Sequence, residues 1–168
     1  MRLIYLLDAN VLIDADRDYY AMDRVPEFWA WLVYQGSIDA VKIPIEIYEE
    51  IKDGDDALAA WAKDDATEAA LLLDEAADPA VVATITDEGY AADLKDDEIE
   101  KVGRDPFLIS YAMIDPNDRT VVTTEVSKPT RQRANRHIPD VCGTFELRCR
   151  NTFEFVRELN FSTNWQQN

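Results

Sequence analysis

The stretch Leu3-Ile4-Tyr5-Leu6-Leu7-Asp8-Ala9-Asn10 decides the expected fold of this 168-residue chain. An apolar run of strand length, from Arg2 to Leu7, ends abruptly at the carboxylate of Asp8. Strands of this kind, alternating with helices, are typical of α/β domains with a parallel sheet. In such folds ligands bind beyond the carboxyl ends of the strands. We therefore expect Asp8 to lie at the ligand-binding edge of a parallel sheet.

The same alternation of short apolar strands and helices continues along the chain. The expected strands cover residues 2–7, 40–43, 120–124 and 147–150. Two of the expected helices cover residues 24–35 and 45–53. A third follows Asp55-Asp56, and a fourth starts at Asp105-Pro106. The last expected helix contains Phe153, Phe155, Val156 and Leu159. Residues 66–101 are acidic and helical with ends that the pattern does not place, and residues 126–137 form a basic, polar loop. With no repeat or linker, residues 1–160 are expected to form one domain and residues 161–168 a polar C-terminal tail.

The charge of the chain limits its partners. It has 34 acidic and 17 basic residues, a formal net charge of −17. Residues 1–100 hold 26 acidic and 7 basic residues, whereas residues 101–168 hold 8 acidic and 10 basic residues. A chain this acidic does not bind nucleic acid through its overall field and needs a local basic patch or a bound cation. The acidic surface either suits a salt-rich cytoplasm or has no environmental meaning.

The sequence contains none of the usual marks of export or membrane insertion. No apolar run approaches the length that crosses a bilayer, and Asp8 interrupts the first apolar run too early for a secretory signal. Cys142 and Cys149 are too few for a disulfide framework and lack the CxxC spacing. We therefore expect a cytoplasmic protein without membrane contact.

Several catalytic chemistries are excluded by their missing residues. Neither GxxxxGK[ST] nor GxGxxG occurs, so a phosphate-binding glycine loop is absent. The only histidine, His137, lies in an Arg-rich loop, and no serine occupies a G-x-S-x-G elbow. Together with Cys142 and Cys149, His137 supplies at most three of the four ligands of a structural zinc site. Both cysteines are therefore expected to be core residues.

Carboxylates remain, at points where a strand ends or a helix begins. Those that follow this pattern are Asp8, Asp105, Glu125 and the glutamates Glu46, Glu49 and Glu50 after Pro44. Four carboxylates that converge on one pocket repel one another unless a cation neutralises them. Hard divalent metals such as Mg²⁺ or Mn²⁺ prefer such oxygen ligands, and metal-held carboxylates are the usual apparatus of phosphodiester hydrolysis.

Each carboxylate also has a purely structural interpretation. Asp8 would cap the helix that follows it, and Asp105 would be an N-cap. Glu125 would be a solvated loop residue. Taken singly, none of the three indicates a function, and only their ordered spacing favours a shared site.

Four short motifs in this order resemble the PIN domain. They are Leu6-Leu7-Asp8-Ala9-Asn10-Val11-Leu12-Ile13, Pro44-x-x-Ile47-x-x-Glu50-Ile51, Asp105-Pro106-Phe107-Leu108-Ile109 and Val121-Val122-Thr123-Thr124-Glu125. Within the PIN domains the chain is most similar to a subgroup of PIN-like, VapC-type toxin-like ribonucleases found beside antitoxin genes. The blocks that fit this subgroup are Trp29-Ala30-Trp31-Leu32, Tyr48-Glu49-Glu50-Ile51, Leu58-Ala59-Ala60-Trp61 and Ile138-Pro139-Asp140-Val141-Cys142. The match runs nearly end to end.

The resemblance implies a three-layer α/β/α fold with a central parallel sheet of four or five strands. It also implies a Mg²⁺- or Mn²⁺-dependent endoribonuclease that is the toxin of a toxin–antitoxin pair and has an antitoxin as partner. We expect hydrolysis to leave a 5′-phosphate and a 3′-hydroxyl. It maps the catalytic and metal-binding carboxylates onto Asp8, Glu50, Asp105 and Glu125, with Asn10 and Thr123 as polar neighbours. In one departure, Glu125 stands where the family often has Asp, which lengthens the reach of this ligand.

Helix geometry distinguishes the three glutamates after Pro44. At about 100° per residue, Ile47 and Ile51 define a buried face, and Glu50 lies ~80° from its centre. Glu46 lies ~120° away on nearly the same side as Glu50, and Glu49 almost opposite the face. We therefore expect Glu50 to be the second acid, with Glu46 in a supporting position and Glu49 in solvent.

A local basic patch follows the last carboxylate. Its members are Lys128, Arg131, Arg133, Arg136 and His137, all within ten positions of one another. Such a cluster in an acidic chain predicts contacts with the phosphate backbone of RNA, chiefly through the lysine and the three arginines. The alternatives are a flexible, solvated loop and a docking site for an acidic partner.

Three further interpretations stay open. A PIN-like scaffold without turnover would act through a protein partner, and the Glu125 departure favours it. A phospho-acceptor receiver domain would need a phosphorylatable Asp at the end of a third strand, where Asp53 is the nearest but closes a helix. The aromatic residues among positions 28–34 would build either a homodimer interface or the core.

Overall fold

The computed structural model describes residues 3–167. Five strands form one sheet in the order β3-β2-β1-β4-β5, and every neighbouring pair is parallel. The strands are β1 (Ile4–Leu7), β2 (Val41–Pro44), β3 (Leu72–Leu73), β4 (Arg119–Val122) and β5 (Cys149–Arg150). The parallel α/β sheet expected from the sequence is thereby confirmed.

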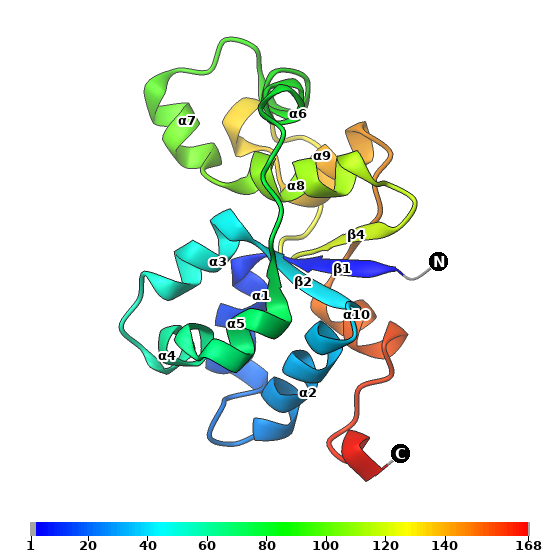
Figure 1. Ribbon diagram of the computed structural model, residues 1–168. Helices are drawn as coiled ribbons and strands as arrows, with labels where there is room; N and C mark the ends of the chain where they lie inside the picture. The colour runs from blue at the N-terminus through cyan, green and yellow to red at the C-terminus, as the bar shows by residue number, and fades with distance from the viewer. Residues whose placement is uncertain (1–2, 168) are drawn as a thin grey trace.

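Helices cover both faces of this sheet and make the fold three-layered (Figure 1). One face carries α1 (Ala9–Asp14), α2 (Pro26–Ser37), α4 (Ala57–Lys63), α5 (Asp65–Leu71) and α10 (Thr152–Glu158). The other face carries α6 (Pro79–Thr84), α7 (Asp96–Val102), α8 (Asp105–Ile114) and α9 (Ile138–Thr144). The remaining long helix, α3 (Ile45–Lys52), follows β2 at the carboxyl end of the sheet. Within residues 3–167, no helix is both long and apolar enough to cross a membrane.

Short helical turns extend or connect these elements. Two π-helical turns, η1 (Ala15–Tyr19) and η2 (Ile85–Tyr90), continue α1 and α6, and two 3₁₀ turns are η3 (Arg133–Asn135) and η4 (Trp165–Gln167). The sequence pattern missed β3 and α9. β3 has only two residues inside a helical, acidic stretch, and α9 follows a polar loop and has Pro139 in its first turn. Residues 1, 2 and 168, which hold the expected start of the first strand and the end of the expected tail, lie outside the described residues.

Three of the four aromatic residues of α2 belong to the core. Phe28, Trp29 and Trp31 are buried, in favour of the core alternative for these three, whereas Tyr34 is 45% exposed. The C-terminal segment packs against them: the rings of Phe161 and Trp31 are 4.9 Å apart, and Trp165 stacks on Tyr34. Residues 161–167 therefore cover the aromatic core and are not a detached tail.

The strand order determines where a ligand would bind. β1 lies at the centre of the sheet between β2 and β4. After β1 the chain adds β2 and β3 on one side, and later β4 and β5 on the other side. In open α/β sheets, such a reversal opens a crevice beyond the carboxyl ends of the strands. Asp8 directly follows β1, and Thr123 directly follows β4. The residues that follow these two strands therefore surround this crevice.

Candidate metal centre

Asp8 is held at the carboxyl end of β1 by the neighbouring strand. Its backbone N–H donates to the carbonyl oxygen of Val122 at 2.9 Å, and its Oδ2 accepts from the hydroxyl of Thr123 at 3.0 Å. Asp8 is only 4% exposed. Although it stands at the N-cap position of α1, its carboxylate makes no capping hydrogen bond. Capping as the sole role of Asp8 is therefore wrong.

Asp105 is the first residue of α8 and lies half-buried. The N-cap position belongs to Arg104, and the structural interpretation of Asp105 as an N-cap is therefore wrong. Arg104 fixes the start of the helix, because its Nη1 donates to the carbonyl oxygen of Glu46 on α3 at 2.5 Å. This contact holds the beginning of α8 beside α3.

The three glutamates of α3 point in different directions. The carboxylate of Glu46 accepts from the hydroxyl of Tyr111 at 3.0 and 3.1 Å, and so turns toward α8. Glu49 and Glu50 are both exposed, although we expected Glu50 to be partly covered at the edge of the buried face. Of the three, only Glu50 is among the charges that raise the pKa of Asp8 and of Asp105. Glu50 is thus the glutamate that faces the crevice.

Glu125 extends from the turn after β4. Its backbone N–H donates to Oγ1 of Thr123 at 3.2 Å, and its Oε2 accepts from the backbone N–H of Ile138 at 3.4 Å. The side chain is partly buried and ties the end of β4 to the first residue of α9. Glu125 is therefore not a solvated loop residue. Of the expected polar neighbours, Thr123 contacts the centre, whereas Asn10 is exposed and its side chain makes no hydrogen bond within residues 3–167.

The carboxylates interact electrostatically across the crevice. Burial raises the pKa of Asp8 from 3.8 to about 7, with the charges of Glu125 and Glu50 adding to the rise and the Thr123 hydrogen bond opposing it. Burial likewise raises the pKa of Asp105 to about 8, together with the charges of Asp8, Glu125 and Glu50. Residues from four separate elements thus share one region of negative potential.

The donor set of this region fits a hard divalent cation. All four side chains offer carboxylate oxygens, and none of them forms an ion pair with a basic residue within residues 3–167. In the same part of the chain, no three Asp, Glu, His or Cys side chains are gathered into a ready-made metal-binding group. Mg²⁺ tolerates such openness, because it keeps several waters and is often bound through only one or two carboxylates.

Tyr90, at the end of η2, is a neighbour of this centre that the sequence did not predict. It is 7% exposed, and its hydroxyl has no hydrogen-bond partner among the described residues. Burial and the nearby charges of Asp105 and Glu125 raise its pKa above the usual range. Tyr90 lies in a helical stretch whose boundaries the sequence does not show, so no sequence pattern identified it as a neighbour of the centre.

We expect Tyr90→Phe to leave the free energy of unfolding unchanged or raised by about 0.5–1 kcal/mol. The substitution removes a buried hydroxyl that forms no hydrogen bond with the described chain, and such groups cost stability. Urea unfolding of the two proteins in EDTA measures the difference. A loss of more than about 1 kcal/mol would mean that the hydroxyl has a partner in the folded protein.

The expected basic patch is divided in the structure. Arg133 forms ion pairs with Asp93 and Glu98, and Arg136 donates to the carbonyl oxygens of Gly89 and Asp140. The side chains of Lys128 and Arg131 are exposed and make no hydrogen bond or ion pair within residues 3–167. His137 contacts the carbonyl oxygen of Val126 through Nδ1 at 2.7 Å.

Two further expectations concern other residues. Cys142 is buried and Cys149 half-buried, and both are free thiols packed with the core, as expected. Asp53, the candidate acceptor of the receiver interpretation, is exposed at the C-terminal end of α3 and does not end a strand. The receiver interpretation therefore lacks its central residue.

The fold and this centre define a three-layer α/β/α protein with four electrostatically coupled carboxylates at the carboxyl edge of a parallel sheet. The chain belongs to the family described as Domain of unknown function (DUF4411), whose model matches residues 5–163. No curated protein and no solved structure shows a significant match to the chain. The resemblance to PIN domains therefore stays a prediction from the motifs.

Proposed function

We propose that this chain is a Mg²⁺- or Mn²⁺-dependent endoribonuclease. The observation that carries the proposal is that Asp8, Glu50, Asp105 and Glu125 interact across the carboxyl edge of the sheet and form no ion pair with a basic residue within residues 3–167. Burial, together with the charges of neighbouring carboxylates, raises the pKa of both aspartates. A protein that keeps uncompensated carboxylates at such a place favours a cation there. Phosphodiester hydrolysis is the chemistry for which carboxylate-held metals are most often used.

Each carboxylate has a distinct part in this proposal. Asp8, Glu50 and Asp105 would hold the cation, and Glu125 would complete or support the site. When bound, the metal activates water and stabilises the charge that develops on the phosphate. Thr123 orients Asp8 through its hydroxyl. Asp105 would have to release a proton to hold a cation, because its pKa of about 8 keeps it largely protonated at neutral pH in the metal-free protein.

The biological setting is part of the proposal and rests on the sequence motifs. We infer a cytoplasmic toxin whose partner is an antitoxin protein. The absence of a membrane-spanning helix in residues 3–167 is compatible with that location.

The test is cleavage of a mixed RNA pool by the purified protein with Mn²⁺, with Mg²⁺ and with EDTA, beside the Asp105→Asn variant. We expect cleavage that requires metal and disappears in the variant, since the variant loses one carboxylate of the centre. Cleavage by the variant at the wild-type rate would indicate a contaminating nuclease and contradict the proposal.

The open arrangement of the carboxylates favours a second candidate, a PIN-like scaffold that acts through a protein partner without turnover. This alternative predicts no metal-dependent cleavage of any RNA. It also predicts that Mn²⁺ leaves the melting temperature unchanged. Calorimetry with and without Mn²⁺ thus separates the two candidates independently of the RNA chosen.

A further inference from the structure

A second, polar pocket opens beside the carboxylate centre. It has a volume of about 200 Å³ and shares Asp105 and Glu125 with the centre. Its other charged or polar walls come from α7 and from the loop after β4. The side chains that matter for its chemistry are Lys101, Arg131, Arg136 and His137. The pocket therefore joins the proposed metal residues to a group of nitrogen donors.

The basic residues of this pocket form no ion pair within the described part of the chain. Lys101 donates to the amide oxygen of Asn135, Arg136 donates only to neutral oxygens, and Arg131 has no side-chain partner. Within residues 3–167, none of these three forms an ion pair with a carboxylate, although the chain has twice as many acidic as basic residues. Positive charges left unpaired in such a chain are available to an anionic ligand.

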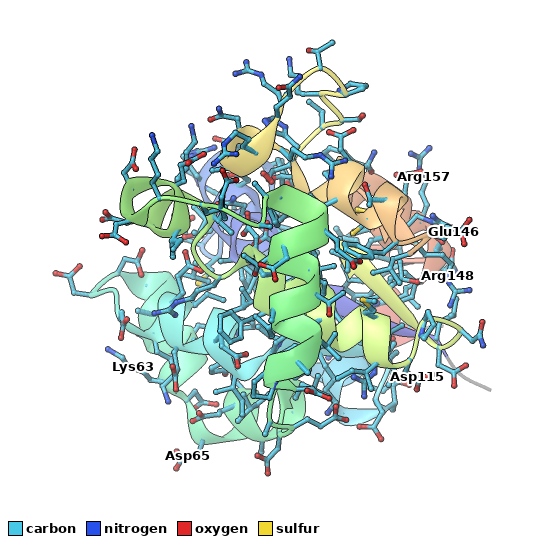
Figure 2. All side chains as sticks on the ribbon, turned by 90° about the horizontal axis from the view of Figure 1, so that it is seen from above. Lys63, Asp65, Asp115, Glu146, Arg148 and Arg157 are labelled. Carbon is cyan, nitrogen blue, oxygen red and sulfur yellow. The ribbon has the colours of Figure 1, made fainter. Side chains whose placement is uncertain are left out.

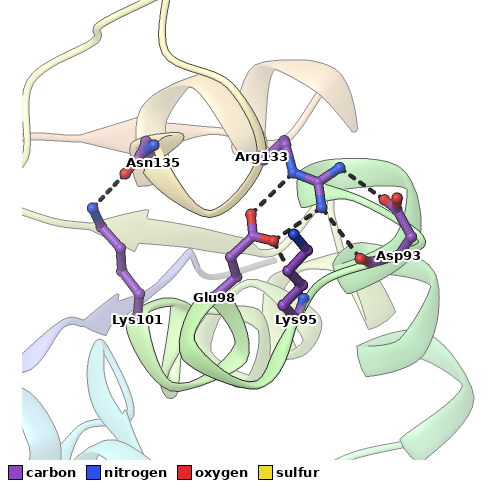
Figure 3. Close-up of polar contacts among 6 residues, drawn as sticks. All are labelled: Asp93, Lys95, Glu98, Lys101, Arg133 and Asn135. Carbon is purple, nitrogen blue, oxygen red and sulfur yellow. Dashed lines mark hydrogen bonds and ion pairs between the residues drawn. The ribbon is translucent and has the colours of Figure 1, made fainter.

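Arg133, which lies between these residues in sequence, serves a different purpose. Its guanidinium makes four hydrogen bonds, two to Glu98 at 3.0 Å and two to the side chain and carbonyl oxygen of Asp93 at 2.8 and 3.2 Å (Figure 3). The residue has a φ of 54°, a left-handed conformation that is costly for a side chain other than glycine. These bonds hold the loop against α7 in that conformation.

We propose that the pocket formed by Lys101, Arg131 and Arg136 binds a backbone phosphate of the RNA strand next to the one that is cleaved. This inference rests on the proposed ribonuclease function and adds the substrate contacts to it. Lys101 and Arg131 are the phosphate-binding residues, and Arg136 contributes its charge at the wall of the pocket. Arg133 is a positioning residue that keeps the loop in place and does not touch the RNA.

The first test measures binding of a short, fluorescein-labelled, single-stranded RNA by anisotropy in EDTA, where no metal-dependent cleavage occurs. We expect Lys101→Ala and Arg131→Ala each to weaken binding about tenfold and to lower the slope of log K against log salt by about 1. The matched controls are Lys63→Ala and Arg157→Ala, two exposed residues at the periphery of the molecule (Figure 2). Equal affinities for the pocket and control variants would overturn the inference, as would an absence of RNA binding by the wild-type protein.

The second test separates positioning from contact at Arg133. Glu98→Gln removes a negative charge and weakens the hold on Arg133. If Arg133 only positions the loop, this variant binds the RNA several-fold more weakly, although the loss of a negative charge would by itself strengthen binding. If Arg133 contacts the phosphate, the variant frees its guanidinium and binds more tightly, and the assignment of Arg133 is wrong.

The outcomes distinguish this inference from the proposed function. Loss of RNA binding in Lys101→Ala and Arg131→Ala, without metal-dependent cleavage by the wild type, would keep the subsite and reject the nuclease. Metal-dependent cleavage with unchanged binding in both variants would keep the nuclease and reject the subsite. Binding of an acidic peptide in preference to the RNA would also reject it and assign the pocket to a protein partner.

Discussion

Replacing Asp8 by Asn is expected to lower the rate of Mn²⁺-dependent RNA cleavage by about a hundredfold or more. Asp8 is buried at the end of the central strand and contributes one of the four charges of the crevice. The amide oxygen of Asn keeps the shape of the side chain and still accepts the hydrogen bond from Thr123, so the fold is preserved. What the variant loses is the negative charge that would hold the cation.

The matched control for this substitution is Asp65→Asn. Asp65 is exposed at the start of α5, at the periphery of the molecule and away from the crevice (Figure 2). It undergoes the same chemical change and should cleave RNA at the wild-type rate. Initial rates with a labelled RNA, with and without EDTA, measure both effects. Full activity of Asp8→Asn would remove this residue from the catalytic centre.

The metal-free protein is expected to lose stability as the pH rises from about 4 to about 8. The pKa of Asp105 is about 8 in the folded protein and 3.8 in its ordinary state. Between these values the folded chain binds a proton that the unfolded chain has released. The free energy of unfolding therefore falls with rising pH through this window and levels off above it. Asp8, with a pKa of about 7, acts in the same direction.

Asp105→Asn tests this expectation because it removes the carboxylate that titrates. In EDTA at pH 8 we expect the variant to be more stable than the wild type by about 1–3 kcal/mol, since one pKa unit corresponds to about 1.4 kcal/mol. At pH 4 the two proteins should be nearly equal. Addition of Mg²⁺ at pH 8 should stabilise only the wild type appreciably. A variant that is less stable than the wild type at pH 8 in EDTA would show that burial and the neighbouring carboxylates do not destabilise the charged form of Asp105.

The sequence predicted the parts of the centre that follow from periodicity. Asp8 directly follows the apolar run that forms β1, and Glu125 lies three residues after the last residue of β4. A parallel sheet brings the ends of such strands to one edge. The spacing of Ile47 and Ile51 indicated the side of α3 that holds Glu50, although both Glu49 and Glu50 are exposed and only electrostatic coupling to Asp8 and Asp105 distinguishes them. These expectations need only the local sequence and the rule that the carboxyl ends of parallel strands lie at the same edge of the sheet.

The parts that escaped prediction depend on contacts between distant segments. Arg133 was expected to bind RNA. Its ion pairs with Asp93 and Glu98, which are about 35 to 40 positions away in sequence, were not expected, and no local pattern indicates this pairing. Tyr90 and Lys101 lie in a stretch where several short helices meet without clear boundaries. β3 was missed because two leucines inside a helical stretch are too few to show the alternating pattern of a strand. In each case the decisive information lies in the tertiary arrangement.

The wide spacing of the four carboxylates has a consequence for synthesis of the chain. They come from the residue that follows β1, from α3, from the start of α8 and from the turn after β4, between residue 8 and residue 125. A ribosome-bound chain therefore has no complete centre until its last quarter is being translated. If the proposed ribonuclease function holds, the chain cannot cleave the messenger that encodes it before about three quarters of its own sequence have been made.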